Sequence, residues 1–202
     1  MHSHETGTGA RPIAGLLQAE HRGARKLDML SLIEASDEHF VWMLEGSEAC
    51  PLHGLTQPPG GVAEPPVLEL LRRIASDLTE HHGFGHWLVV VDDEVVGSCG
   101  YMRRPTSDGA VEIGYGIAPA RRGLGLATLA VAALVERIAK DPIVRRIIAE
   151  TSVDNIASQR VLERNQFVLD GNRHDPDDGD MLTWRRDITT PTHPNLSSPA
   201  DE

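Results

Sequence analysis

Two glycines and two arginines stand where a long aliphatic segment, residues 124–140, is expected to begin as a helix. Gly123 and Gly125 are poor residues for such a start, since each costs about 1 kcal/mol relative to alanine inside a helix. Arg121 and Arg122 add positive charge at the end where the macrodipole is already positive. A bound phosphate would resolve these faults, because it accepts backbone N–H groups, neutralises arginines and needs close approach. The alternative is a glycine-rich turn with two solvated arginines.

Two well-known phosphate loops do not fit this stretch. A P-loop needs Gly-Lys-Ser/Thr after its second glycine, whereas Leu126 and Ala127 follow Gly125. A dinucleotide fingerprint needs a third glycine where Thr128 stands. The run from Arg122 to Ala127, RGLGLA, instead resembles the R-G-x-G-x-A acetyl-CoA loop of the GNAT N-acetyltransferase superfamily.

A second signature about thirty residues further on supports the resemblance. Asn155-x-x-Ser158 and the following segment 161–167 resemble N-x-x-S/A-x-x-x-L-x-K-x-G-F. With the motif EIGY at residues 112–115, the chain is most similar to the ribosomal-protein N-terminal (Rim-type) acetyltransferases. Leu162 stands where many GNAT enzymes carry a tyrosine that acts as general acid. Proton donation by a tyrosine at this position is therefore excluded. Gln166 replaces the usual glycine, and we expect its neighbour Asn165 to adopt the left-handed angles that the turn needs.

The resemblance implies an acetyl-CoA site and direct attack of an amine on the thioester, without an acyl-enzyme. The implied cofactor-binding residues are Ile117 and Ala118, through their backbone N–H groups, then Arg122, Gly123, Leu124, Gly125, Leu126, Ala127, Asn155 and Ser158.

The same resemblance suggests three catalytic residues. Glu112, on the strand before the loop, is a candidate base for the ammonium proton, although it can equally be a solvated strand acid. Ser158 matches the hydroxyl that protonates the leaving thiolate. The acidic segment 170–180 has five Asp and one Arg, a net charge of -4, and is expected to be a loop. Asp177 is its best-placed second base, with Asp175 or His174 as substitutes, against the alternative of a polar hairpin loop.

The surrounding pattern predicts the elements that position these residues. Strands are expected at 27–33, 86–91, 94–101, 110–118, 145–151, 167–169 and 181–185, and helices from Ser36 or Asp37 to Leu44 and at 67–79, 124–140 and 155–164. His81 and His82 are expected to follow the second helix and cap its end. The fold class is therefore α/β, a GNAT-type mixed and mostly antiparallel sheet flanked by helices. Segment 1–24 is expected to be flexible, 25–186 the domain, and 187–202 a disordered tail.

Composition narrows the class of protein further. The 202 residues contain 30 acidic and 19 basic side chains, a net charge of -11. This balance argues against binding nucleic acid or an anionic membrane. Cys50, Cys99 and the histidines show no zinc-site spacing, so no metal is expected. No apolar run approaches the ~18 residues of a membrane span, and the N-terminus lacks the features of a secretory signal. We expect a cytoplasmic monomer or homodimer.

Together these observations predict an acetyl-CoA-dependent N-acetyltransferase acting on a primary amine, with a protein N-terminus as the first choice of acceptor. A small amine, such as an aminoglycoside or a polyamine, is the alternative acceptor. A catalytically silent acyl-CoA-binding domain is the alternative from another functional class, because Leu162 occupies the position of the general-acid tyrosine. A phosphate-binding module for another nucleotide is a third alternative.

Overall fold

The computed structural model describes residues 30–47, 50, 54–82 and 85–188. Its elements in chain order are β1 (Leu30–Glu34), α2 (Asp37–Glu45), α3 (Pro65–His82), β2 (His86–Val91), β3 (Glu94–Tyr101), β4 (Ala110–Ile117), the 3-10 turn η1 (Pro119–Arg121), α4 (Leu126–Ile138), β5 (Arg146–Ser152), α5 (Ile156–Arg164), β6 (Val168–Asp175) and β7 (Gly179–Asp187). The expectations for segment 1–24, for residues 27–29 and for the tail beyond 188 lie outside the described residues.

The strands form one sheet in the order β1-β2-β3-β4-β5-β7-β6. Among the described strands, β4 and β5 pair in parallel, and every other neighbouring pair is antiparallel. This arrangement confirms the predicted mixed, mostly antiparallel sheet. The parallel pair is the one joined by a helix, α4, as a parallel connection requires.

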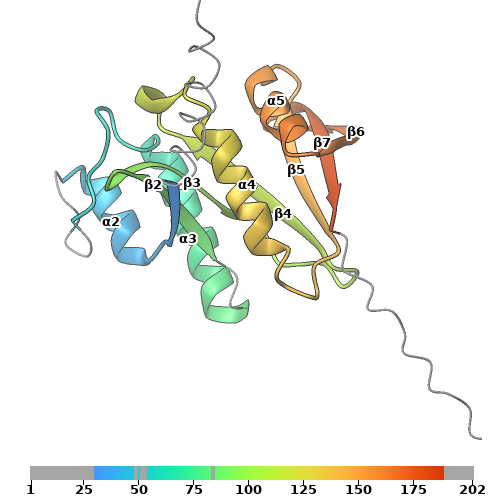
Figure 1. The fold of residues 1–202 in the computed structure, drawn as a ribbon, viewed down its shortest axis with the longest axis horizontal. Coiled ribbons are helices and arrows are strands. Elements are labelled where there is room, and N and C mark those ends of the chain that lie inside the picture. The colour runs from blue at the N-terminus through green and yellow to red at the C-terminus, as the bar shows by residue number, and fades with distance from the viewer. Residues whose placement is uncertain (1–29, 48–49, 51–53, 83–84, 189–202) are drawn as a thin grey trace, which may run out of the picture.

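The helices cover the two faces of the sheet unequally (Figure 1). On one face, α4 packs Val131, Leu134 and Ile138 against the strands, and these side chains are almost completely buried. On the other face, α2 and α3 bury Phe40 and Leu68 over the β1–β3 half. Beyond β3 this second face carries charged side chains, which alternate along β4 and β5 with residues buried under α4.

The helix expected from Ser36 or Asp37 and the strands expected at 86–91 and 94–101 are confirmed. Ser36 caps α2, and His39 completes a capping box by contacting the Ser36 backbone N–H. Asp92 and Asp93 both have positive φ, 51° and 62°, and form the turn between β2 and β3. Both features belong to the β1–β3 half of the sheet.

Three boundary predictions are wrong. The segment 170–180 is largely strand, because β6 and β7 extend into a hairpin that leaves only 176–178 between them. His81 and His82 lie inside α3 and do not follow it. The left-handed residue after α5 is Gln166, with φ 63°, whereas Asn165 has φ -93°. Asn165 is buried instead, and its side-chain amide donates to the Thr128 and Val161 carbonyls.

Candidate active site between β4 and β5

The site begins where the two parallel strands separate. Their register runs from Ala110↔Arg146 to Ile113↔Ala149 and then stops, although β4 continues to Ile117. Figure 1 shows the two strands diverging beyond this point, with α4 and α5 on either side. The gap leaves backbone groups of β4 that no longer face a partner strand.

The backbone N–H of Ile117 is directed into this gap. Ala118 donates its own N–H to the Val96 carbonyl at 2.9 Å, so the alternation of an antiparallel ladder turns Ile117 away from β3. Of the two amides expected to contact the cofactor, only that of Ile117 is therefore available. The prediction for Ala118 is wrong in this respect, because its N–H belongs to the β3–β4 ladder.

The start of α4 presents free backbone donors to the same gap. Gly125 is the N-cap residue, with φ 78°, and no side chain caps the helix. The first helical hydrogen bond comes from Leu129 to the Gly125 carbonyl, so the N–H groups of Leu126, Ala127 and Thr128 have no partner within the helix. The helix begins two residues later than predicted, because both glycines adopt left-handed angles and form the loop.

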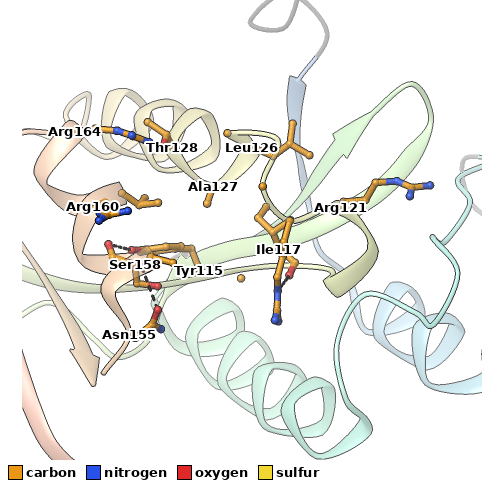
Figure 2. A pocket seen from close by; sticks show the side chains of 16 residues that line it. Tyr115, Ile117, Arg121, Leu126, Ala127, Thr128, Asn155, Ser158, Arg160 and Arg164 are labelled. Carbon is orange, nitrogen blue, oxygen red and sulfur yellow. Dashed lines mark hydrogen bonds between the residues drawn. The ribbon is translucent and has the colours of Figure 1, made fainter. Parts of the chain in front are cut away.

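The two arginines of the loop have different surroundings. Arg121 forms a bidentate ion pair with Glu94 at 2.6 and 2.8 Å, and its side chain points away from Ser158 (Figure 2). Arg122 donates from Nε to the Ile117 carbonyl at 3.1 Å. Arg121 thus ties the loop to β3, and Arg122 is the cation of the pair that remains at the gap.

A cavity of about 510 Å³ joins these groups. It is lined by Tyr115, Gly116, Ile117, Arg121, Arg122, Gly123, Gly125, Leu126, Ala127, Thr128, Asn155, Ala157, Ser158, Arg160, Val161 and Arg164. Ala118 and Leu124 are the predicted cofactor-binding residues that do not line it. Ala118 is completely buried, and Leu124 is 49% exposed outside the cavity.

The cavity also contains residues to which the motifs assigned no role. Arg160 and Arg164 lie one helical turn apart on α5, and neither pairs with a carboxylate in the part of the chain that the structure describes. Their spacing of four residues would have indicated a basic helix face. Tyr115 enters from β4, and its hydroxyl donates to the Ser158 carbonyl at 3.1 Å.

Glu112 lies on the opposite face of β4, because its neighbours Val111 and Ile113 are buried on the α4 side. Its side chain is 18% exposed and pairs with Arg103 at 2.8 Å. Burial raises the pKa of Glu112, Arg103 opposes that rise, and the negative charge of Glu150 adds to it. Glu150 on β5 is held in turn by Arg173, whose hydrogen bonds lower the Glu150 pKa. Glu112 is thus a poorly solvated carboxylate beside the gap.

Asp177 lies in the turn at the tip of the β6–β7 hairpin, is exposed and does not line the cavity. Its backbone N–H donates to the Asp175 carboxylate at 3.0 Å. Asp175 also pairs with Arg173 at 2.5 Å, which lowers its pKa to about 2. His174 contacts Asp180 on the exposed surface. These contacts stabilise the hairpin turn. Neither Asp177 nor Glu112 lines the cavity, and both remain predictions as bases; Glu112 is the less exposed of the two and lies on β4.

Within the described ranges, no group of three His, Cys, Asp or Glu side chains has a metal-binding arrangement. No helix there is both long and apolar enough to cross a membrane. Neither Cys50 nor Cys99 forms a disulfide, and both are buried. The polar groups of the cavity lining are backbone amides, arginines, the hydroxyls of Tyr115, Thr128 and Ser158, and the Asn155 side-chain amide.

Strand separation, an uncapped helix start and arginines define a site for an anionic ligand with an extended arm. Residues 30–168 match the family model described as "Acetyltransferase (GNAT) domain". The chain belongs to the GNAT acetyltransferase family, which confirms the resemblance seen in the two signatures.

Two curated relatives match part of the chain. "Uncharacterized N-acetyltransferase YjdG" of Bacillus subtilis is 34% identical over 89 residues, 43% of this chain and 53% of the relative. "Ribosomal-protein-serine acetyltransferase" of Escherichia coli is 31% identical over 85 residues, 42% and 48% of the two chains. The chain spans about half the length of these relatives.

Solved structures share the fold over more of the chain. RimL, a ribosomal L7/L12 alpha-N-protein acetyltransferase in complex with coenzyme A, has a TM-score of 0.61 at 21% identity, covering 79% of this chain and 94% of that one. An aminoglycoside acetyltransferase in complex with coenzyme A has a TM-score of 0.57 at 20% identity, covering 78% and 94%. The predicted GNAT fold is thereby confirmed.

Proposed function

We propose that this protein is an acetyl-CoA-dependent N-acetyltransferase that acetylates a primary amine, with a protein N-terminus as the preferred acceptor. The observation that carries the proposal is the convergence of the uncapped α4 start, the Ile117 amide and Ser158 on one cavity at the separated strands. The pyrophosphate of acetyl-CoA would bind the N–H groups of Leu126, Ala127 and Thr128. The pantetheine arm would then extend along β4 toward Ser158.

The thioester carbonyl would accept a hydrogen bond from the Ile117 N–H, which stabilises the charge that develops on its oxygen. The amine would approach from the face of β4 that carries Glu112, and this carboxylate would take the ammonium proton directly or through a water molecule. Attack forms the C–N bond, and the C–S bond breaks as the thiolate leaves. Ser158 would donate its hydroxyl proton toward that thiolate.

The acceptor class is proposed from two kinds of support. A curated relative is named a ribosomal-protein-serine acetyltransferase, and structural neighbours include ribosomal-protein acetyltransferases. The net charge of -11 also favours a cationic acceptor over an anionic one. A small amine is the second candidate, because neighbours of similar TM-score bind aminoglycosides. We further propose that the protein is cytoplasmic and acts as a monomer or homodimer.

An acceptor panel tests the proposal. Peptides beginning with Ser, Ala or Met, an aminoglycoside and a polyamine would each be mixed with acetyl-CoA, and thiol release would be measured. We expect peptides to give the highest kcat/KM. If an aminoglycoside or a polyamine gave the highest kcat/KM, the preferred acceptor would be a small amine and not a protein N-terminus. Binding of acetyl-CoA without turnover on any amine would instead support a silent acyl-CoA-binding domain.

A further inference from the structure

Two hydrogen bonds hold the backbone of Ser158, one at its N–H group and one at its carbonyl oxygen. The Asn155 side chain accepts the Ser158 N–H at 3.1 Å, and the Tyr115 hydroxyl donates to the Ser158 carbonyl at 3.1 Å. Figure 2 shows both contacts, with Asn155 and Tyr115 approaching Ser158 from different elements. Asn155 is the cap of the same helix, whereas Tyr115 belongs to β4, 43 residues earlier.

The contact from Tyr115 crosses the gap at the centre of the site. The ladder between β4 and β5 stops at Ile113↔Ala149, so strand pairing does not fix the first turn of α5 relative to the end of β4. Tyr115 lies two residues beyond that point. Its hydroxyl therefore connects the strand that carries Glu112 and the Ile117 amide to the helix that carries Ser158.

The Tyr115 hydroxyl stays protonated, so it can keep donating its hydrogen bond. Tyr115 is half-buried against the core, and burial raises its pKa to about 12. The phenol therefore keeps its proton across the physiological pH range and continues to donate it to the Ser158 carbonyl. The chain has two tyrosines, and the other, Tyr101, packs on Trp87 and does not line the cavity. Leu162, on α5, is completely buried and offers no hydroxyl.

We propose that Tyr115 is a positioning residue for Ser158, holding the serine hydroxyl at the sulfur of the bound thioester through the Ser158 carbonyl. This inference rests on the proposed function. As the C–N bond forms and the C–S bond breaks, the thiolate needs a proton donor within hydrogen-bond distance of its sulfur. Loosening the first turn of α5 weakens that contact most when charge has developed on sulfur, so it lowers kcat more than it changes cofactor affinity.

A double-mutant cycle tests this coupling. The four proteins are the wild type, Tyr115→Phe, Ser158→Ala and the double variant, assayed with acetyl-CoA and the best amine. We expect Tyr115→Phe to lower kcat about tenfold while the KM for acetyl-CoA stays within about twofold. In the Ser158→Ala background the same change should cost less than about twofold, because Tyr115 acts through Ser158. An equal loss in both backgrounds, a loss confined to KM, or an unchanged kcat would overturn the proposal.

A control variant and a second readout separate this proposal from the proposed function. Tyr101→Phe removes the other phenol and should leave kcat within about twofold of the wild type. Hydrogen exchange of amides in 155–164 needs no acceptor, and it should be faster in Tyr115→Phe than in Tyr101→Phe. Unchanged exchange would disprove the connection between β4 and α5. A wild type that transfers acetyl to no amine would overturn the proposed function, and exchange would still test the connection.

Discussion

Arginines gather around the cavity although the molecule as a whole is acidic. In a chain with a net charge of -11, Arg122, Arg160 and Arg164 line one cavity. Arginine forks match phosphate geometry, and grouped cations without carboxylate partners favour an anionic ligand. We therefore propose that the two α5 arginines contact the phosphates at the nucleotide end of the coenzyme.

Replacing Arg164 should weaken binding of the nucleotide end alone. Arg164→Gln is expected to raise the KM for acetyl-CoA about tenfold, which corresponds to a loss of about 1.4 kcal/mol. With acetyl-pantetheine, which lacks the nucleotide, the KM should be unchanged. Arg73→Gln is a matched control, because Arg73 lies on α3 outside the cavity. An equal loss with both donors would remove Arg164 from the phosphate site.

If Glu112 is the general base, its raised pKa predicts how kcat/KM depends on pH. Only its ionised form accepts a proton, so kcat/KM should fall as pH drops through the raised pKa of Glu112. Glu150→Gln removes a negative neighbour and should move this acidic limb to lower pH. Arg103→Gln removes a positive partner and should move the limb to higher pH.

The pH-rate profiles of these variants are compared with that of Asp177→Asn, which changes an exposed carboxylate in the hairpin turn. Glu112→Gln should lower kcat/KM about 100-fold, within the usual range for general-base catalysis. If Asp177→Asn caused the larger loss, or if the Glu150 and Arg103 variants moved the limb in the same direction, Glu112 would not be the base.

The sequence predicted site residues whose type is required by the local backbone, such as a glycine with left-handed angles or an asparagine that caps a helix. Gly123 and Gly125 were identifiable because only glycine adopts such angles easily beside a ligand, and Asn155 because it caps a helix three residues before Ser158. Tyr115 could be read as part of EIGY, but its contact with Ser158 depends on strand separation. Sequence spacing carries no information about that separation.

At the scale of elements, the start of α4 lacks the usual stabilising residues of a helix N-terminus, and this lack suits it to bind an anion. The helix has no side-chain cap and no acidic residue in its first turn. Both absences lower helix stability but leave the N–H groups and the positive dipole end available to an anion. The helix start is therefore better suited to a ligand than to stability alone.

Ala127→Glu separates these two effects. A carboxylate in the first turn favours the helix by about 0.3–1 kcal/mol, so the melting temperature should stay the same or rise. The same charge should repel the pyrophosphate and weaken acetyl-CoA binding by at least about tenfold. Ala127→Gln has a similar size without the charge and should bind more tightly than the glutamate variant. Calorimetry showing equal affinity in both variants would contradict the phosphate assignment.

The β6–β7 hairpin shows where pattern-based prediction fails. β6 is an edge strand that is exposed along most of its length, so it lacks the alternation of apolar and polar residues that indicates a strand. Its charged side chains are placed by cross-strand ion pairs such as Arg173 with Glu150. The buried strands β2 and β3 and the alternately buried strand β5 have strong apolar signals, and their bounds were predicted to within one residue.

At the scale of the whole molecule, buried His86 makes folding depend on pH. Its ring lies against Gly100 and Phe40, and both ring nitrogens lack a hydrogen-bond partner among the described residues. Burial lowers the His86 pKa from 6.5 to about 4. The unfolded chain therefore takes up a proton below about pH 6.5 while the folded chain does not, and stability falls as pH drops toward 4.

Across this window of about 2.5 pH units, the loss amounts to at most about 3 kcal/mol. His86→Leu should therefore flatten the fall in unfolding free energy between about pH 6.5 and 5, above the range where most carboxylates titrate. His174→Gln, which changes a histidine on the exposed surface, is the comparison variant. Urea denaturation at several pH values measures both, and an unaltered slope in His86→Leu would show that other groups cause it.

Acetyl transfer itself provides the most direct test of the central claim, that the cavity between β4 and β5 binds acetyl-CoA for attack by an amine. A peptide beginning with serine would be incubated with acetyl-CoA and either the wild type or Ala127→Glu. Mass spectrometry would measure acetylated peptide against free coenzyme A. We predict equal amounts of both products with the wild type and a strongly reduced yield with the variant. Undiminished transfer by the variant, or coenzyme A released without acetylated peptide, would contradict the account.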